Sequence, residues 1–390
     1  TASPTIKTPT QVVGINGIGM LGDITTKSAQ GGTATNSPII ALSVNSDRGE
    51  TAGREGGHVL ALTSEGDVYA WGYNGNGQLG NGSTYGPRPG SNFATYPIRV
   101  LAGASPYWYT VDNNGERHEN TEADESWTDQ NHYLTGVVDI SAGYDHSLAL
   151  LKDGTVMAWG NTSNGQAGDI VNNISRSLVP QFVRQGGSVG QGPWLNNAIS
   201  VHASGVSTLK GTSAILRSDG TVWTWGDNDK GQLGDNSTRS KQFANPVLLE
   251  STGYTTKGTP DSYIHKDHND LDNYLTDTSV VLDQVTELTL GYTHMMALLG
   301  EYELAGGTIS RTGTPVYSWG NNGNLQLGRT TPNPKTNLMA GPVTKTTAED
   351  YQIYGIYEAM YRDMAALAGQ RPLTEVETLL MNKLKSEADN

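Results

Sequence analysis

The chain has 390 residues, of which 49 are glycine, 8 tryptophan and 18 tyrosine, while charged residues make up only 16%. This composition excludes a helical bundle or a coiled coil and favours short strands joined by tight turns. The 25 basic and 39 acidic residues give a formal net charge of −14, which argues against binding nucleic acid or an anionic membrane through a basic face.

Cysteine is absent, which excludes disulfides, thiolate zinc sites and cysteine nucleophiles. No run of about 18 apolar residues indicates a transmembrane helix. A cysteine-free, acidic chain of this kind fits a secreted bacterial protein. We therefore predict that it is secreted or lies at the cell surface, with no insertion into the membrane.

A ten-residue segment recurs along the chain. It reads WGYNGNGQLG at 71–80, WGNTSNGQAG at 159–168, WGDNDKGQLG at 225–234 and WGNNGNLQLG at 319–328. A worn copy, VGINGIGMLG, stands at 13–22 with valine in the tryptophan position. Repeats with this spacing are supersecondary units that bury their apolar faces only by stacking on one another.

Two apolar runs precede the first three clear copies and flank a turn of the type Glu-Gly or Asp-Gly, whereas the fourth copy carries an insertion at 301–312 in that place. The turns are Glu65-Gly66, Asp153-Gly154 and Asp219-Gly220. Glycine accepts the positive φ that a tight turn between two strands requires, so each pair of runs predicts a β-hairpin. The second strand of each hairpin ends in the Trp-Gly pair.

A proline-led apolar strand is expected downstream of each copy. The leading prolines are Pro38, Pro97, Pro180, Pro246 and Pro342. Proline is tolerated at a strand start because its missing N–H lies outside the ladder. About four short strands per repeat is the pattern of a propeller blade, and the signature tryptophans are predicted to pack between blades. These are Trp71, Trp159, Trp225 and Trp319.

A histidine recurs at one position of the repeat, as His58, His146 and His294. Recurrence at a fixed repeat position indicates a structural role. We expect each imidazole to satisfy backbone groups of a turn.

The combined pattern G-x-x-H-x-x-A-L-x-x-x-G-x-V-x-x-W-G-x-N-x-x-G-Q-L-G resembles the regulator of chromosome condensation repeat family over most of residues 8–343. The resemblance implies an all-β fold, a β-propeller of four-stranded blades, most often seven. Five signature turns are visible here. Either the ring has fewer blades, or some blades are degenerate, or the chain is part of a longer array.

Three insertions separate a proline strand from the next G-x-x-H strand, at 101–136, 184–198 and 250–284. Because they occupy the same place in the repeat, we expect them to emerge from one face or rim. Aromatic residues in them stand outside the signature: Tyr107, Trp108, Tyr109, Trp127 and Trp194. They either pin the insertions onto the propeller or form exposed anchors for a protein or a sugar ring.

The third insertion contains spaced carboxylate and amide groups, namely Asp267, Asn269, Asp270 and Asp272. Oxygen ligands of this kind suit calcium. The EF-hand register fails, however, because Leu271 and Asp272 stand where a ligand and a glycine are needed. We therefore expect a solvated acidic loop, with no metal site and no cofactor.

Catalytic signatures are scarce. The chain has no G-x-S-x-G, H-E-x-x-H or G-x-x-x-x-G-K-[ST] motif. We predict no catalytic residues and a protein that is not an enzyme.

The sequence divides into a propeller over residues 1–345 and a helical C-terminal hairpin over 346–390. Apolar residues recur at helical spacing from Tyr354 to Leu367, and Pro372 stands near the first turn of a second helix. We expect this short α-helical tail to pack on the propeller; the alternatives are that it links to a following domain or binds a partner.

The predicted function is a non-catalytic extracellular or cell-surface scaffold that binds a protein or a glycan through the propeller rim and its insertions. One alternative is a structural subunit of a surface assembly or filament, in which self-association lets neighbouring chains complete the propeller. Another is a carbohydrate-active enzyme, which would need two carboxylates about 5–9.5 Å apart beside Trp108 or Trp194.

Overall fold

The computed structural model describes most of the repeat region. The described residues are 37–45, 57–88, 90–103, 109–111, 117–119, 133–168, 175–186, 193–206, 210–249, 280–300, 316–328 and 336–343. The worn signature at 13–22 and the expected helical hairpin at 346–390 lie outside the described residues.

Four antiparallel blades of four strands make up most of the described part of the molecule; three are separate sheets, and the fourth is extended to a six-stranded sheet by β15 and β16. Blade 1 consists of β1 (Ile39–Val44), β2 (His58–Thr63), β3 (Val68–Tyr73) and β4 (Phe93–Arg99). Blade 2 consists of β7 (Val137–Ala142), β8 (His146–Leu151), β9 (Val156–Asn161) and β10 (Arg176–Phe182). Blade 3 consists of β11 (Ala198–Val206), β12 (Lys210–Arg217), β13 (Val222–Gly226) and β14 (Lys241–Pro246). Blade 4 consists of β17 (Val285–Leu290), β18 (His294–Leu299), β19 (Val316–Asn321) and β20 (Thr336–Pro342).

Two further strand pairs belong to the insertions. The first insertion holds a two-stranded ribbon, β5 (Tyr109–Val111) and β6 (Arg117–Glu119). The third is bounded by β15 (Leu248–Leu249) and β16 (Val280–Val281), and β15 also pairs with β20 of blade 4.

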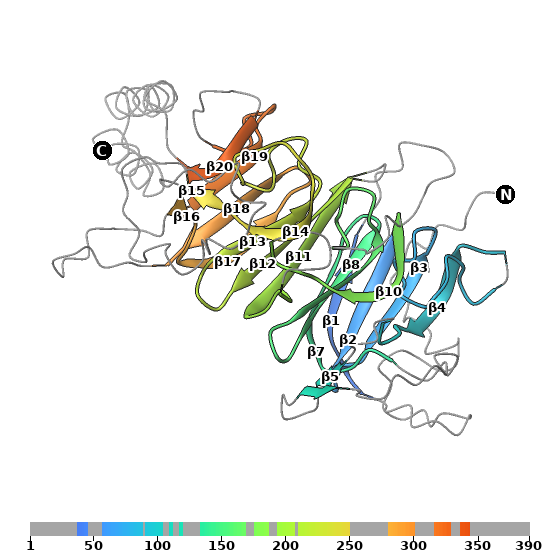
Figure 1. Ribbon diagram of the computed structural model, residues 1–390. Coiled ribbons are helices and arrows are strands. Elements are labelled where there is room, and N and C mark those ends of the chain that lie inside the picture. Colours follow the sequence, from blue (N-terminus) through green and yellow to red (C-terminus); the bar gives the residue numbers. More distant parts are fainter. Residues whose placement is uncertain are drawn as a thin grey trace, which may run out of the picture.

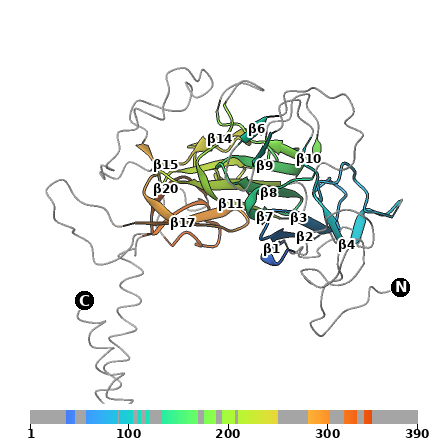
Figure 2. The ribbon, with the colours of Figure 1, turned by 90° about the horizontal axis from the view of Figure 1, so that it is seen from below.

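The blades follow one another from β1–β4 at one end of the molecule to β17–β20 at the other (Figure 1). Their first strands lie side by side, with β1 against β7, β7 against β11 and β11 against β17. The view from below shows the same succession of sheets (Figure 2). The fold is therefore an all-β propeller of four-stranded blades, and four blades lie within the described residues.

The hairpins predicted from the acidic-glycine turns are confirmed. Gly66, Gly154 and Gly220 have φ values of 86°, 82° and 81°, which glycine adopts without strain. The carbonyl of each turn glycine also accepts a hydrogen bond from the blade that follows, at 3.2, 3.0 and 3.0 Å. The turn therefore closes its own hairpin and contacts the next blade.

The expected proline-led strands are placed differently in the structure. Pro97 and Pro180 lie inside β4 and β10, and Pro246 and Pro342 end β14 and β20. These are the last strands of their blades, and their register with the neighbouring strand shifts near the proline. An edge strand with an irregular register loses little by lacking an N–H there.

Pro38 does not precede a last strand at all, because it leads into β1, the first strand of blade 1. The corresponding first strands of the other blades, β7, β11 and β17, begin where the insertions end. Sequence reasoning assigned no strand there because the variable insertions obscure the repeat on that side.

Each pair of neighbouring blades encloses one hydrophobic cluster. The face of a blade toward its predecessor is called here the backward face, and the opposite face the forward face. Residues of the forward face of blade 1, such as Leu60 and Val68, pack with Ile140 and Trp159 of the backward face of blade 2. The core thus lies between the sheets.

Candidate functional site

The signature tryptophans join the blades by a recurring hydrogen bond. Trp159, Trp225 and Trp319 are fully buried on the backward faces of blades 2, 3 and 4. Each indole Nε1–H donates to the main-chain carbonyl of the signature glutamine in the preceding repeat. The acceptors are Gln78 at 2.8 Å, Gln166 at 3.0 Å and Gln232 at 2.9 Å. Trp71 holds the same position on blade 1 but is only partly buried.

The recurring histidines bridge blades too, though not to the turn backbone that the sequence led us to expect. His58 Nε2 lies 2.7 Å from Ser147 Oγ, and that hydroxyl donates to the Gln78 carbonyl at 2.9 Å. Because the serine proton is directed at the carbonyl, the imidazole Nε2 is the donor. The expected turn contact is thus replaced by a serine of the next blade.

The same arrangement joins blades 2 and 3 through His146 and Ser213, at 2.9 Å. Burial lowers the pKa of both His58 and His146 to about 3, which keeps the rings neutral. Thr212 occupies the histidine position in blade 3, and His294 in blade 4 is only partly buried. A neutral, buried imidazole bonded to serine lends itself to a structural contact between blades.

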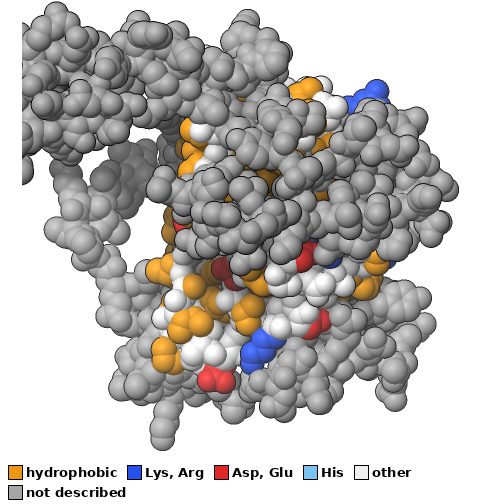
Figure 3. All heavy atoms as spheres, turned by 90° about the vertical axis from the view of Figure 1, so that its left-hand side faces the viewer, with side chains coloured by type: hydrophobic (Ala, Val, Ile, Leu, Met, Phe, Trp, Pro, Cys, Tyr) orange, Lys and Arg blue, Asp and Glu red, His pale blue; other side chains and the backbone are white. Residues whose placement is uncertain are grey.

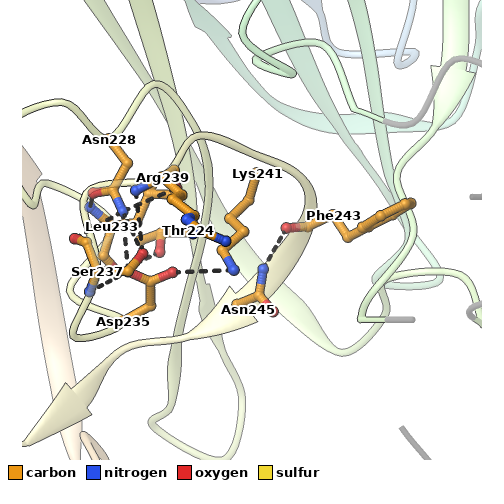
Figure 4. A network of polar contacts seen from close by, with 9 residues as sticks. All are labelled: Thr224, Asn228, Leu233, Asp235, Ser237, Arg239, Lys241, Phe243 and Asn245. Atoms are coloured by element: carbon orange, nitrogen blue, oxygen red, sulfur yellow. Dashed lines mark hydrogen bonds and ion pairs between the residues drawn. The ribbon is translucent and has the colours of Figure 1, made fainter. Parts of the chain in front are cut away.

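In blades 1, 3 and 4, the signature loop has a buried asparagine two residues after the Trp-Gly pair, whereas blade 2 has Thr162 there. Asn228 donates to Asp235, Ser237 and the Arg239 carbonyl, and its own Oδ1 accepts from the Leu233 amide at 2.9 Å (Figure 4). Asn74 makes the matching set of bonds in blade 1. The polar residues of the signature are thus used to shape the loop.

Two buried carboxylates in this region escaped the sequence analysis. Burial raises the pKa of Asp145 to about 6, although Asn161 donates to it at 2.5 Å. Asp227 accepts from Gln232 at 2.9 Å, and burial raises its pKa as well. Both stand next to signature residues, Asp145 before His146 and Asp227 after Gly226, and that adjacency is the signal that could have singled them out.

The described stems of the three insertions are tied at the same place in the repeat. Leu101 pairs with Tyr133, Arg184 with Trp194, and Leu248 with Val281, each antiparallel. Each stem thus connects the end of a last strand to the start of the next blade's first strand. The insertions leave the blades beside the acidic-glycine turns, so we call this the insertion face.

Cation–π contacts close two of these stems. The Arg184 guanidinium lies 3.8 Å from the ring centroid of Trp194, and the Phe182 ring is 5.3 Å away on the blade. Arg99 lies in the same way over Tyr133, at 4.3 Å, and bonds to Asp67 at 2.6 Å. Trp194 therefore pins its insertion to blade 2.

The other predicted aromatic anchors are not placed by the structure. Tyr107, Trp108 and Trp127 lie outside the described residues, and only the backbone of Tyr109 is described, paired with Glu119 in the β5–β6 ribbon. Their role in binding stays a prediction.

The weak calcium candidates Asp267, Asn269, Asp270 and Asp272 likewise lie outside the described residues. In the part of the chain that the structure does describe, no three His, Asp or Glu side chains come together in a way that would hold a metal ion. That same part contains no helix with the length and apolar character of a membrane span.

The two ends of the row of blades differ from the joints between them. On the backward face of blade 1, Leu42 and Val44 are 64% and 63% exposed. On the forward face of blade 4, His294, Met296 and Leu298 are partly buried, whereas the matching residues of blades 1 and 2 are buried. Hydrophobic side chains gather on the end of the molecule that carries blade 4 (Figure 3).

Known proteins resemble this chain through its repeats. Models of the regulator of chromosome condensation (RCC1) repeat match residues 56–78, 137–166 and 219–256. A probable E3 ubiquitin-protein ligase, HERC6 of Homo sapiens, is 30% identical over 193 residues, which are 50% of this chain and 14% of that protein. The mitochondrial RCC1 domain-containing protein RUG3 of Arabidopsis thaliana is 26% identical over 208 residues, 46% of this chain and 42% of the relative. The chain thus spans less than half the length of these relatives.

Among solved structures, the chain is similar to human WBSCR16, with a TM-score of 0.42 and 19% identity over 79% of this chain and 53% of that one. Prp20p of Saccharomyces cerevisiae follows with a TM-score of 0.37 and 17% identity over 80% of this chain and 64% of its own. The matched repeats coincide with blades 1 to 3 as the structure places them. Blades 1 to 3 thus contain repeats that match the RCC1 repeat models, and the fold is an RCC1-like β-propeller.

Proposed function

We propose that the chain is a non-catalytic scaffold that binds a protein partner through the insertions on one face of its blades. The observation that carries the proposal is the common position of the three stems, each tied where a last strand hands over to the next blade. Insertions that leave a repeat array at one face often form its binding surface.

The internal chemistry of the blades supports a structural use of their polar groups. The signature histidines and asparagines of blades 1 to 3 bond to neighbouring blades or to their own loops. Buried polar groups with such partners stabilise one arrangement of the sheets. What varies from repeat to repeat is the insertions, and variation of that kind suits recognition.

The stems favour recognition by a preorganised surface. Arg184 stacked on Trp194 and Arg99 stacked on Tyr133 hold the two ends of an insertion together at the blade. Fixing the stem reduces the conformational entropy that the insertion loses on binding.

The charge of the chain suggests the chemistry of the partner. The formal net charge is −14, and the turns beside the stems carry Glu65, Asp153 and Asp219. A protein with a basic surface would be attracted to this face, and nucleic acid would be repelled. Glycan recognition, secretion and a place at the cell surface stay predictions from composition.

The test removes one insertion at a time from the intact chain. Residues 104–132 are replaced by a short Gly-Ser linker in one variant and residues 187–192 in another, leaving the stem pairs in place. As a matched control, residues 169–174, which connect the signature segment of blade 2 to β10 and belong to none of the three insertions, are replaced in the same way. Partners retained by the parent chain are identified by cross-linking and mass spectrometry.

We expect at least one insertion variant to lose a specific partner by tenfold or more, with an unchanged melting temperature, while the control retains it. Equal retention by the parent, both insertion variants and the control would contradict the proposal.

The alternative of a subunit in a surface assembly draws on the exposed Leu42 and Val44 at one end of the blades. Its test is the mass of the chain in solution, because an assembly completed by neighbouring chains requires oligomers. The carbohydrate-active alternative would require a carboxylate pair beside Trp108, which lies outside the described residues, or beside Trp194, whose described ring contacts are Phe182 and Arg184.

A further inference from the structure

The backward face of blade 1 is built like a joint but lacks a described neighbour. In the strand registers, Leu42 and Val44 correspond to Ile140 and Ala142 of blade 2, which are 6% and 5% exposed. Trp71 stands at the position where the other signature tryptophans donate to a glutamine carbonyl of the previous repeat. This face therefore has the apolar residues and the indole of a joint.

The described joints show what a covering segment must supply. The hydrogen-bond acceptor is a main-chain carbonyl, so any residue can provide it. The next residue is a buried leucine in two of the three joints, Leu79 and Leu233. The residue after that is glycine, because a Cβ on Gly80 or Gly234 would lie 2.9 or 3.0 Å from the indole nitrogen of the next blade.

The worn copy at 13–22 retains each of these requirements in the same order. Met20 supplies the carbonyl, Leu21 the apolar side chain, and Gly22 the space for the indole. Its main departure is Val13 in place of tryptophan, and tryptophan is the residue that reaches backward to an earlier repeat. The copy has therefore kept the parts that contact a following blade.

Chain length and backbone conformation allow this contact. Residues 23–38 connect the copy to β1 and reach up to about 50 Å when extended. In blades 2 to 4, the residue before the first strand has a positive φ: Gly136 at 70°, Asn197 at 58° and Gln284 at 59°. Pro38 holds this place in blade 1, and its ring fixes φ near −65°. Blade 1 therefore lacks the backbone conformation with which the other blades contact the hairpin turn of the preceding blade. A signature loop alone is then sufficient to cover its backward face.

A second copy of the chain, stacked head to tail, fits the face less well. To stack on the next copy, its blade 4 would need a glycine at the position of Gly77 and Gly165. A Cβ on these two glycines would lie 2.9 and 2.5 Å from a carbonyl oxygen of the next blade's last strand. Blade 4 has Leu325 at this position, 66% exposed and with φ 61°. A leucine side chain there would collide with a following blade.

We propose that residues 13–22 cover the backward face of blade 1, with the main-chain carbonyl of Met20 accepting the hydrogen bond from Trp71. Leu21 then packs toward Leu42 and Val44. The row of blades thereby closes its first face with a segment of its own chain.

The test uses the absence of native cysteine and the full-length chain. Val44→Cys places a thiol in the covered face, and Ile199→Cys provides an exposed reference on β11. The rate of reaction with a small thiol reagent is measured for each single-cysteine protein under native conditions. We expect Val44→Cys to react at least tenfold more slowly than Ile199→Cys.

Two further variants identify the covering segment. Gly22→Leu, added to Val44→Cys, puts a side chain against the indole and should raise the rate to that of the reference. Gly17→Ser is the matched control, because serine and aspartate occupy the same position in Ser163 and Asp229; it should leave the protection unchanged.

The proposal would be overturned if Val44→Cys reacted as fast as Ile199→Cys in the parent chain, or if Gly22→Leu left the protection intact. Protection that grows with protein concentration would also overturn it, because that result assigns the cover to a second copy. Melting temperatures and light-scattering masses of the same samples verify that each variant is folded and monomeric.

Discussion

The joints between blades and the two end faces carry the same motif in different settings. In the joints, each tryptophan is buried and bonded to the previous repeat, and two joints add a His–Ser bond. At the ends, Trp71 and His294 stand at the corresponding positions but are only partly buried. The difference teaches that the motif is two-sided: tryptophan contacts the preceding repeat, and the glutamine–leucine–glycine segment contacts the following one.

The largest effect should come from removing a tryptophan from a joint. Trp225→Ala deletes a fully buried indole and its bond to Gln166, so we expect the free energy of unfolding to fall by about 3–5 kcal/mol. Trp71→Ala should cost less, because Trp71 is only partly buried and the segment proposed to cover it is a signature loop without the rest of a blade. Urea unfolding of both variants measures the difference, and equal losses would break the comparison.

The signature position of Gly165 and Leu325, which faces the next blade, should also distinguish the joints from the ends of the row. Gly165→Leu drives a side chain into Lys241 and Gln242 of the next blade, and overpacking of this kind costs about 1–3 kcal/mol. The reverse change at the end, Leu325→Gly, should leave the melting temperature nearly unchanged, since no described blade follows it. If Leu325→Gly destabilised the protein as much as Gly165→Leu, blade 4 would have an unrecognised neighbour.

The histidine bridges predict a pH dependence of stability. Burial holds the pKa of His58 and His146 near 3, so the unfolded chain binds more protons than the folded chain between about pH 3 and 6.5. The free energy of unfolding therefore falls as the pH falls through this window. His202 and His294, whose pKa burial also lowers, act in the same sense, whereas Asp145, Asp227 and Asp283, whose pKa burial raises, act in the opposite sense above their ordinary value of 3.8.

His146→Thr tests this by copying Thr212 of blade 3. The variant removes one of the proton-linked histidines, so its stability should fall less steeply with acid, by at most about 1.4 kcal/mol per pH unit. Denaturant titrations at pH 7, 6 and 5 give both slopes. An unchanged slope would mean that the imidazole is not buried in the joint.

The smallest effect concerns an insertion stem. Arg184→Ala removes the guanidinium from the Trp194 ring, which we expect to cost about 0.5–1 kcal/mol. Hydrogen exchange should accelerate at the stem and stay unchanged in β8 and β9. Acceleration throughout blade 2 would show that the stem is part of the blade core.

The repeats were sufficient to predict the blades, because a glycine turn and a tryptophan that recur at fixed positions indicate the same hairpin each time. The first strands β7, β11 and β17 escaped, since insertions of unequal length precede them. The partner of His58 escaped as well, because Ser147 is 89 positions away and meets it only after the blades stack. Val13 and Leu325 visibly depart from the motif in the sequence. Their effect on stacking could not be predicted from it, because that effect depends on which side of the signature loop faces the next blade.

The measurement that bears most directly on the two-sided motif is the mass of the chain in solution, by light scattering over a wide range of concentration. We expect a single chain of 41.6 kDa at every concentration, because the exposed Leu325 would collide with a blade stacked on blade 4 and because we propose that residues 13–22 cover blade 1. A mass that rises with concentration toward dimers or longer rows would contradict this, and would identify the end faces as surfaces for assembly.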